Sequence, residues 1–203
     1  MLVITGDTKV VERGKGDKIF INTTGFGEQH PKASISVQNI QPGDKILVNG
    51  YIAQHGIAIM SEREGLQFES TITSDTTNLN FLVNDLLDTF GDKIKLFRDP
   101  TRGGLGTVLH EIANDISLGV YLKENDIPVE KQVAAACEML GLDPMYVANE
   151  GVFVVVVDPS IENEVLALMK NHEKVKILLL LASFSEHPNK VVMQEVVLVA
   201  KEL

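Results

Sequence analysis

The sequence has little cysteine, few basic residues and no long hydrophobic run. Its single cysteine, Cys137, excludes an internal disulfide and is typical of a reducing cytoplasm. Lys and Arg total 18 against 28 Asp and Glu, and the formal charge of −10 argues against nucleic acid or an anionic membrane as partner. The longest apolar stretch, 175–182, is far shorter than the roughly 20 residues that span a bilayer. The N-terminus has none of the features of a signal peptide. We therefore expect a cytoplasmic protein.

Several chemical motifs are also missing. The chain contains no Walker phosphate loop, no dinucleotide Gly-x-Gly-x-x-Gly and no Gly-x-Ser-x-Gly elbow, and its 5 histidines show no paired zinc spacing. What remains is an ordinary globular composition, with 203 residues of which 44% are hydrophobic and 23% charged. This length suits one substantial domain, or one domain and part of another.

Hydrophobic periodicity predicts helices and strands that interleave without strict alternation. Strands 1–12 and 18–27 form a hairpin, whose sheet is either completed by distant segments or absent from the chain, because a lone hairpin cannot bury itself. The other expected strands are 45–53, 93–97, 119–124, 151–159, 175–183 and 190–199, and the expected helices are 55–65, 79–90, about 105 to near 119, 129–141 and 160–172. This order predicts an α+β fold with a mixed, largely antiparallel sheet packed with helices.

Residues at element ends refine this prediction. Asn49-Gly50 can instead mark a tight hairpin turn, Gly65 stops a helix, and Ser160 caps one. The stretch "DPTRGGLGTVLHE", residues 99–111, opens another helix, for which Asp99 or Thr101 is the expected cap.

The same stretch is a candidate anion site. Gly103 and Gly104 let the backbone N–H groups of a helix N-terminus approach a ligand, and Arg102 adds a bidentate clamp for an oxyanion. The alternative is that the glycines serve close packing and that the arginine is solvated. Local chemistry leaves these two interpretations balanced.

Three further stretches carry candidate chemistry. Asp7 and Lys9 lie on one face of a strand, where they suit a magnesium ion and a nucleotide phosphate, or form an exposed ion pair. Glu150, which follows Asn149 before a buried strand, is either a general base or metal ligand, or part of a solvent-facing turn. His55 begins a helix, where a neutral ring can contact a ligand or only cap the helix. Cys137 lies in a helix, where a buried thiol is more common than a nucleophile.

Taken together, four stretches resemble a known family. They are "TGDTKVVERGKGDKIFINTTGFG", "GDKILVNGYIAQHGIAIMSEREGL", "DPTRGGLGTVLHEIA" and "IPVEKQVAAACEMLGLDPMYVANEG". In this order they resemble the HypE family of carbamoyl dehydratases, which act in hydrogenase maturation. The resemblance runs from about residue 3 to about residue 157. HypE proteins belong to the superfamily of aminoimidazole ribonucleotide synthetase, selenophosphate synthetase and thiamine-monophosphate kinase.

The resemblance implies an ATP-dependent reaction on a C-terminal cysteine. The family receives a carbamoyl group on that thiol from HypF and dehydrates it to a thiocyanate, and the cyanide reaches a nickel-iron centre through HypC and HypD. It further implies ATP and Mg²⁺ as cofactors, a homodimer and a cytoplasmic location. Asp7 then holds metal and nucleotide. Thr8, His55, Gly103, Gly104 and Asn149 contact ATP or phosphate, and Lys9, Arg102 and Glu150 are catalytic.

The resemblance also implies a domain division. Residues 1–35 match the last strands of an N-terminal ATP-binding domain, and residues 36–203 match the C-terminal α+β domain. The family ends in Pro-Arg-Ile-Cys, whereas this chain ends "VVMQEVVLVAKEL". We therefore expect that this chain alone neither accepts a carbamoyl group nor makes a thiocyanate. The alternatives are a non-catalytic interaction module of the maturation machinery and another ATP-dependent member of the superfamily.

Overall fold

The computed structural model describes residues 4–15, 20–65, 72–173, 175, 179–185 and 191–194. Its centre is one six-stranded sheet in the order β2-β4-β1-β5-β3-β6. The strands are β1 (Lys45–Val48), β2 (Ile94–Arg98), β3 (Gly119–Lys123), β4 (Val154–Val157), β5 (Leu179–Ser185) and β6 (Val191–Gln194). Every neighbouring pair is antiparallel except β3 and β6, which are parallel. The predicted α+β class with a mixed, largely antiparallel sheet is confirmed.

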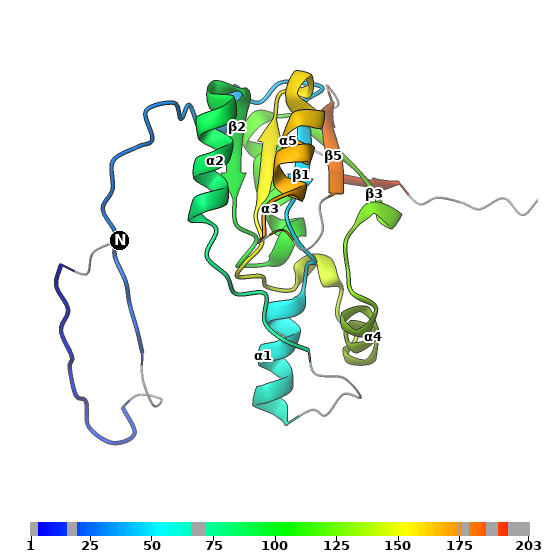
Figure 1. Cartoon of the computed structure of the whole chain (residues 1–203). Helices are drawn as coiled ribbons and strands as arrows, with labels where there is room; N and C mark the ends of the chain where they lie inside the picture. The colour runs from blue at the N-terminus through cyan, green and yellow to red at the C-terminus, as the bar shows by residue number, and fades with distance from the viewer. Residues whose placement is uncertain are drawn as a thin grey trace, which may run out of the picture.

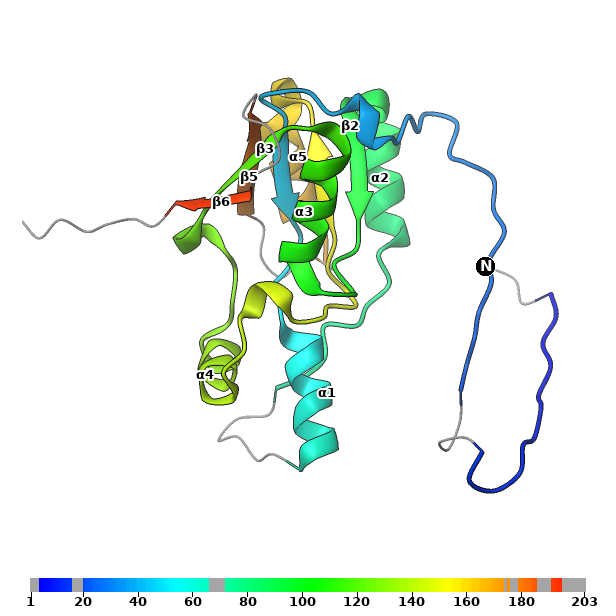
Figure 2. The same ribbon diagram turned by 180° about the vertical axis from the view of Figure 1, so that it is seen from behind.

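Helices cover both faces of this sheet (Figures 1 and 2). Five α-helices are described, namely α1 (Gln54–Glu64), α2 (Asn80–Phe90), α3 (Gly104–Ile116), α4 (Lys131–Leu140) and α5 (Glu162–Lys170). Helix α3 packs on one face with Ile46, Val48, Val154 and Val156, whereas α2 and α5 pack on the other with Leu47, Val155 and Val157. Because neighbouring residues of a strand point to opposite faces, the all-valine strand β4 supplies both cores.

Helices α1 and α4 lie beyond one end of the sheet, below it in Figure 1. They share a third, smaller core made of Ala53, Ile57, Ile72, Val133, Ala136, Cys137 and Val147. Helix α1 ends at Gly65, which adopts φ 63° and donates its backbone N–H to the carbonyl of Ser61. The predicted stop at Gly65 is confirmed, since this left-handed conformation suits glycine.

The N-terminal hairpin is not formed. Residues 4–15 and 20–29 are exposed, contain no strand, and run outside the rest of the molecule (Figures 1 and 2). The predicted strands 1–12 and 18–27 are therefore wrong over their described residues, while 1–3 and 18–19 lie outside these. No described strand pairs with this segment, and two strands alone bury too little apolar surface to be stable. The division into residues 1–35 and 36–203 stays a prediction.

Three predictions about element ends are also wrong. Asn49-Gly50 is no hairpin turn, because β1 pairs with β4 and β5, which are distant in sequence. The side chain of Asp158, not of Ser160, caps the turn that precedes α5, since Asp158 accepts the N–H of Ser160 at 2.8 Å. The N-cap of α3 is Gly103, which offers no side-chain hydrogen bond, and not Asp99 or Thr101 as predicted.

Candidate active site

The candidate site lies where the ends of β1 and β2 meet the start of β4, along one edge of the sheet that several loops share. Val48 at the end of β1 and Arg98 at the end of β2 both pair with Val154 at the start of β4. The antiparallel register therefore places the loops after β1 and β2 beside the loop before β4. His55, Arg102 and Glu150 belong to these three regions.

Asn149 joins the three regions. Its side chain is fully buried, and its Oδ1 accepts the N–H of Ala53 at 2.8 Å, two residues before His55. Its Nδ2 donates to the carbonyls of Pro100, at 2.9 Å, and Val147, at 3.0 Å. The structure thus makes Asn149 a positioning residue for the segments of His55, Arg102 and Glu150. Its contact with ATP or phosphate stays a prediction.

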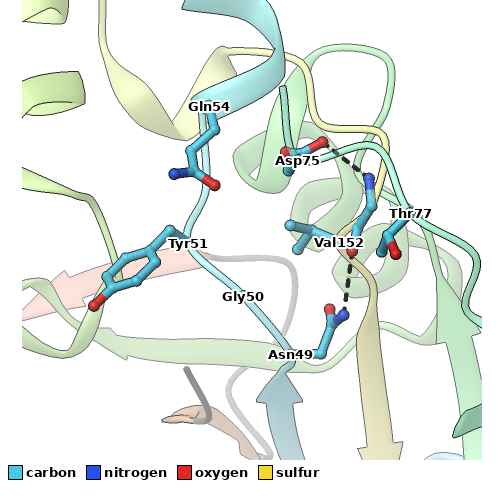
Figure 3. Close-up of a pocket in the computed structure, with 8 residues that line it drawn as sticks. Asn49, Gly50, Tyr51, Gln54, Asp75, Thr77 and Val152 are labelled. Atoms are coloured by element: carbon cyan, nitrogen blue, oxygen red, sulfur yellow. Dashed lines mark hydrogen bonds between the residues drawn. The ribbon is translucent and has the colours of Figure 1, made fainter. Parts of the chain in front are cut away.

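Asp75 holds the backbone of Glu150. One carboxylate oxygen, Oδ1, accepts the N–H of Glu150 at 2.8 Å and that of Gly151 at 2.9 Å. Asn49 holds the next part of the same loop, because its Nδ2 donates to the carbonyl of Gly151 (Figure 3). Its Oδ1 accepts the N–H of Phe153. Gly151 has no room for a side chain, since a Cβ there would meet the backbone of Asp75. The main chain around Glu150 is therefore fixed from two sides.

The Glu150 side chain faces His55. Its Oε1 lies 3.9 Å from His55 Nε2, and the two side chains are 46% and 22% exposed respectively. The other ring nitrogen, Nδ1, lies 2.9 Å from Ser74 Oγ, which also lies 2.7 Å from Thr76 Oγ1. His55 is therefore held on one side by a hydroxyl and presents its second nitrogen to a carboxylate. Such a pair can accept and pass on protons at the protein surface.

Arg102 is exposed on the loop before α3 and forms no hydrogen bond or ion pair with any residue of the described segments. Gly103 and Gly104 both have positive φ, 70° and 67°. The two glycines have different roles. The nearest atoms to a Cβ at Gly103 would belong to the side chain of Thr107, whereas a Cβ at Gly104 would collide with the backbone of Met145 and Tyr146. Gly104 therefore allows close packing within the protein, and Gly103 remains at the surface beside Arg102.

The expected helix caps before α3 bond to each other instead. Thr101 Oγ1 donates to Asp99 Oδ2 at 2.8 Å, so neither side chain caps α3. The prediction of Asp99 or Thr101 as N-cap is wrong, because the left-handed Gly103 takes that position.

Asp7, Thr8 and Lys9 are not brought to this edge. All three lie on the exposed N-terminal segment, which runs outside the rest of the molecule in Figure 1. There Asp7 Oδ1 accepts the N–H of Thr8 at 2.8 Å. Within the described ranges, no three His, Cys, Asp or Glu side chains converge as a metal site. These residues do not fit a complete magnesium site, and their roles toward metal, ATP and catalysis stay predictions.

Cys137 is a core residue. It is 1% exposed on α4, and burial, with a further contribution from Asp143, raises the pKa of its thiol. A buried thiol with a raised pKa is a poor nucleophile. This agrees with the sequence-based interpretation of Cys137 as a packing residue.

Residues 41–178 match the family described as AIR synthase related protein, C-terminal domain. The chain belongs to this family. Carbamoyl dehydratase HypE of Bradyrhizobium diazoefficiens is 50% identical over 170 residues, which are 84% of this chain and 49% of that protein. The chain thus spans about half the length of the curated relatives it matches. This similarity confirms the resemblance to HypE within the AIR synthase related family.

Solved structures agree with this assignment. A HypE–HypF complex has a chain that matches with a TM-score of 0.77 and 40% identity, covering 80% of this chain and 53% of the other. HypE in complex with ATP matches with a TM-score of 0.75 and 34% identity, covering 79% of this chain and 50% of the other. The family fold is therefore present in this chain, with the loops of His55, Arg102 and Glu150 at one edge of the sheet.

Sequence reasoning missed the partners that hold these loops. Asn49, Ser74 and Asp75 were not predicted as site residues. The polar run 73–78 precedes a helix, where such residues usually serve as caps, and nothing local indicates that Asp75 reaches Glu150. Its burial, at 5% exposed, identifies it only in the folded chain.

Proposed function

We propose that this domain forms one wall of an ATP-dependent active site that converts a cysteine thiocarboxamide to a thiocyanate. The observation that supports this most strongly is the pair of Glu150 and His55, held by Asp75 and Ser74 at the edge where Arg102 also lies. HypE relatives are named carbamoyl dehydratases, and one HypE structure is a complex with ATP.

The proposed reaction converts R–S–C(=O)–NH₂ to R–S–C≡N. The carboxamide oxygen takes the terminal phosphoryl group of ATP and leaves as phosphate when the C–O bond breaks. Both N–H protons are lost as the C≡N bond forms, so the elements of water leave the carboxamide and ATP becomes ADP.

Acidic and basic residues of the site have different tasks in this reaction. Glu150 accepts a proton from the nitrogen and shares it with His55, since a base must lie within reach of the proton that it removes. Arg102 stabilises the negative charge on the phosphorylated oxygen. In the complete protein, Lys9 is the second candidate for stabilising this negative charge. Mg²⁺ is the expected companion of ATP, with Asp7 as its predicted ligand. Because the described residues offer no complete set of ligands, no step is assigned to it.

The family setting extends the proposal. We propose HypF as carbamoyl donor, HypC and HypD as acceptors of the cyanide for a nickel-iron hydrogenase, a homodimer and a cytoplasmic location. One solved relative is a HypE–HypF complex. Across the described part of the chain, no helix is long and apolar enough to cross a membrane.

By itself this chain is proposed to be inactive. Its one cysteine, Cys137, is buried and unsuited to accept a carbamoyl group. Incubation with HypF, carbamoyl phosphate and ATP, followed by intact-mass measurement, is expected to show no adduct. A carbamoyl adduct on the chain would contradict this.

Arg102 is tested in a complete HypE that carries these residues. Arg102→Ala is expected to lower the rate of thiocyanate formation on the order of 100-fold, as for other lost transition-state donors. Arg63→Ala is the matched control, because Arg63 is an exposed arginine in the last turn of α1. Equal rates for both variants would remove Arg102 from the mechanism.

A second candidate function is an interaction module without catalysis. It is favoured by apolar side chains on the N-terminal segment, where Phe20, Ile21 and Phe26 are 73%, 77% and 92% exposed. Contiguous patches of exposed apolar side chains mark surfaces that bind partners. Titration of the chain with magnesium-ATP in a calorimeter separates the two candidates, since an interaction module gives no heat of binding.

A further inference from the structure

Two buried oxygens near the candidate active site have no hydrogen-bond donor among the described residues. They are Oε1 of Gln54 and Oδ2 of Asp75. The residues are only 3% and 5% exposed. Buried polar atoms in folded proteins are almost always satisfied by protein, water or a bound ligand, so two such atoms together call for an occupant.

Both residues line one pocket. Its other lining residues are Asn49, Gly50, Tyr51, Thr77, Gly151 and Val152. In Figure 3, the Gln54 amide oxygen and the Asp75 carboxylate point into the space between α1 and the loop of Asp75. The cavity volume of about 10 Å³ is on the order of what a single water-sized particle needs.

The chemical groups that line the pocket indicate that its occupant is positively charged. An amide oxygen and a carboxylate oxygen accept hydrogen bonds or bind cations, and neither attracts an anion. No Lys, Arg or His is among the lining residues, so the carboxylate of Asp75 has no cationic side chain in this pocket. A buried carboxylate is stabilised by a positive partner.

Size and coordination select the kind of cation. Mg²⁺ requires a near-ideal octahedron and keeps several waters, for which the cavity has no room. Carbonyl-type oxygens are the ligands that replace the hydration shell of potassium. A potassium ion is close to a water molecule in size, and ammonium has the same charge and a similar size.

We propose that Gln54 and Asp75 form a binding site for a water-sized monovalent cation, potassium or ammonium. This proposal does not depend on the proposed dehydratase function. The cation binds Oδ2 of Asp75 while Oδ1 of the same carboxylate holds the N–H groups of Glu150 and Gly151. Occupancy therefore stabilises the loop of Glu150. Gln54 begins α1, whose positive helix end opposes a cation, so the attraction comes from the Asp75 charge.

Thermal unfolding of the chain in different chloride salts tests the site. At equal ionic strength and about ten times the Kd, potassium or ammonium is expected to raise Tm by about 3–5 °C above choline. If only one of the two ions raises Tm, that ion is the one that the site binds. Equal Tm in all salts would overturn the proposal.

Variants locate the effect. Asp75→Asn keeps an acceptor for the two N–H groups but removes the charge, and Gln54→Leu removes the second oxygen; both are expected to abolish the salt-specific shift. Gln38→Leu is the matched control, since Gln38 is exposed and lies outside the pocket. If the two pocket variants shift like this control, the proposal fails.

A thallium-soaked crystal of the unchanged chain avoids any dependence on the folding of variants. Thallium(I) replaces potassium and gives an anomalous peak, expected between Gln54 Oε1 and Asp75 Oδ2. A water without anomalous signal at that position would contradict the cation site.

Discussion

The carboxylate of Asp75 accepts the backbone N–H of Glu150 at 2.8 Å, although 75 residues separate them. The same oxygen accepts the N–H of Gly151 at 2.9 Å. One side chain therefore fixes the main chain that presents the proposed base. The position of the Glu150 loop therefore depends on Asp75, which is distant in sequence from this loop and from β4, the strand that follows it.

Removal of this acceptor is expected to destabilise the fold. Asp75→Ala leaves two N–H groups without a partner, which predicts a loss of about 2–3 kcal/mol in the free energy of unfolding. Urea denaturation followed by circular dichroism measures it. Asp115→Ala, at an exposed aspartate of α3, is the control and is expected to change stability by less than about 0.5 kcal/mol. Similar losses in both variants would show that Asp75 does not have this role.

Gly104 and Gly141 form a matched pair for a second prediction. Both have φ 67°, but a Cβ at Gly104 meets the backbone of Met145 and Tyr146, whereas a Cβ at Gly141 meets nothing within 4 Å. Gly141→Ala is expected to cost about 1 kcal/mol through its left-handed conformation alone. Gly104→Ala adds a steric conflict and is expected to cost about 2–3 kcal/mol more. Equal losses of stability would show that the contact at Gly104 is absent in solution.

Asp44 predicts an unusual pH dependence. It is 2% exposed, and burial raises the pKa of its carboxyl despite the N–H of Gln41 and the charge of Lys95, which lower it. The folded chain thus holds this proton more tightly than the unfolded chain. The resulting stability is present below the unfolded pKa of about 4 and is lost as pH rises through the folded pKa. Asp44→Asn, which keeps an acceptor for Gln41, is therefore expected to be more stable than the unchanged chain at pH 7 and equal to it in acid.

Asp158 is the natural contrast. Hydrogen bonds from the side chain and backbone of Ser160 hold the pKa of its carboxyl below the usual value. Its stabilising effect is present above pH 4 and is lost as pH falls through the folded pKa. Asp158→Asn is expected to lower Tm at pH 7, with a difference that shrinks in acid. If the two variants respond to pH in the same direction, the burial of Asp44 is not the cause of its effect.

Much of the fold follows from local patterns. The apolar periodicity of residues 79–90 predicts α2, and the β-branched run 154–157 predicts β4, because both signals are carried by neighbouring residues. The described residues of the predicted N-terminal strands form no strand, although their side chains favour one. A strand needs a partner for its backbone, and the described residues of this chain supply none.

The site divides in the same way. Glu150 and His55 are candidates from their chemistry and their place beside predicted elements, and the fold brings them within 3.9 Å, while their roles stay predictions. Asp75 was missed because its role comes from burial and from contacts with residues distant in sequence. Gly104 packs closely against the protein and Gly103 is exposed, and anion binding at Gly103 and Arg102 stays a prediction.

The central claim, that Glu150 is the base of a dehydration, is tested by Glu150→Gln in a complete HypE carrying these residues. The amide keeps the shape of the side chain but cannot take the proton. With carbamoylated cysteine and ATP, we expect the variant to bind ATP normally and to form thiocyanate at least 100-fold more slowly, measured as the loss of one water from the intact protein. The exposed control Glu138→Gln is expected to react at the unchanged rate. Thiocyanate formation by Glu150→Gln at the rate of this control would contradict the account.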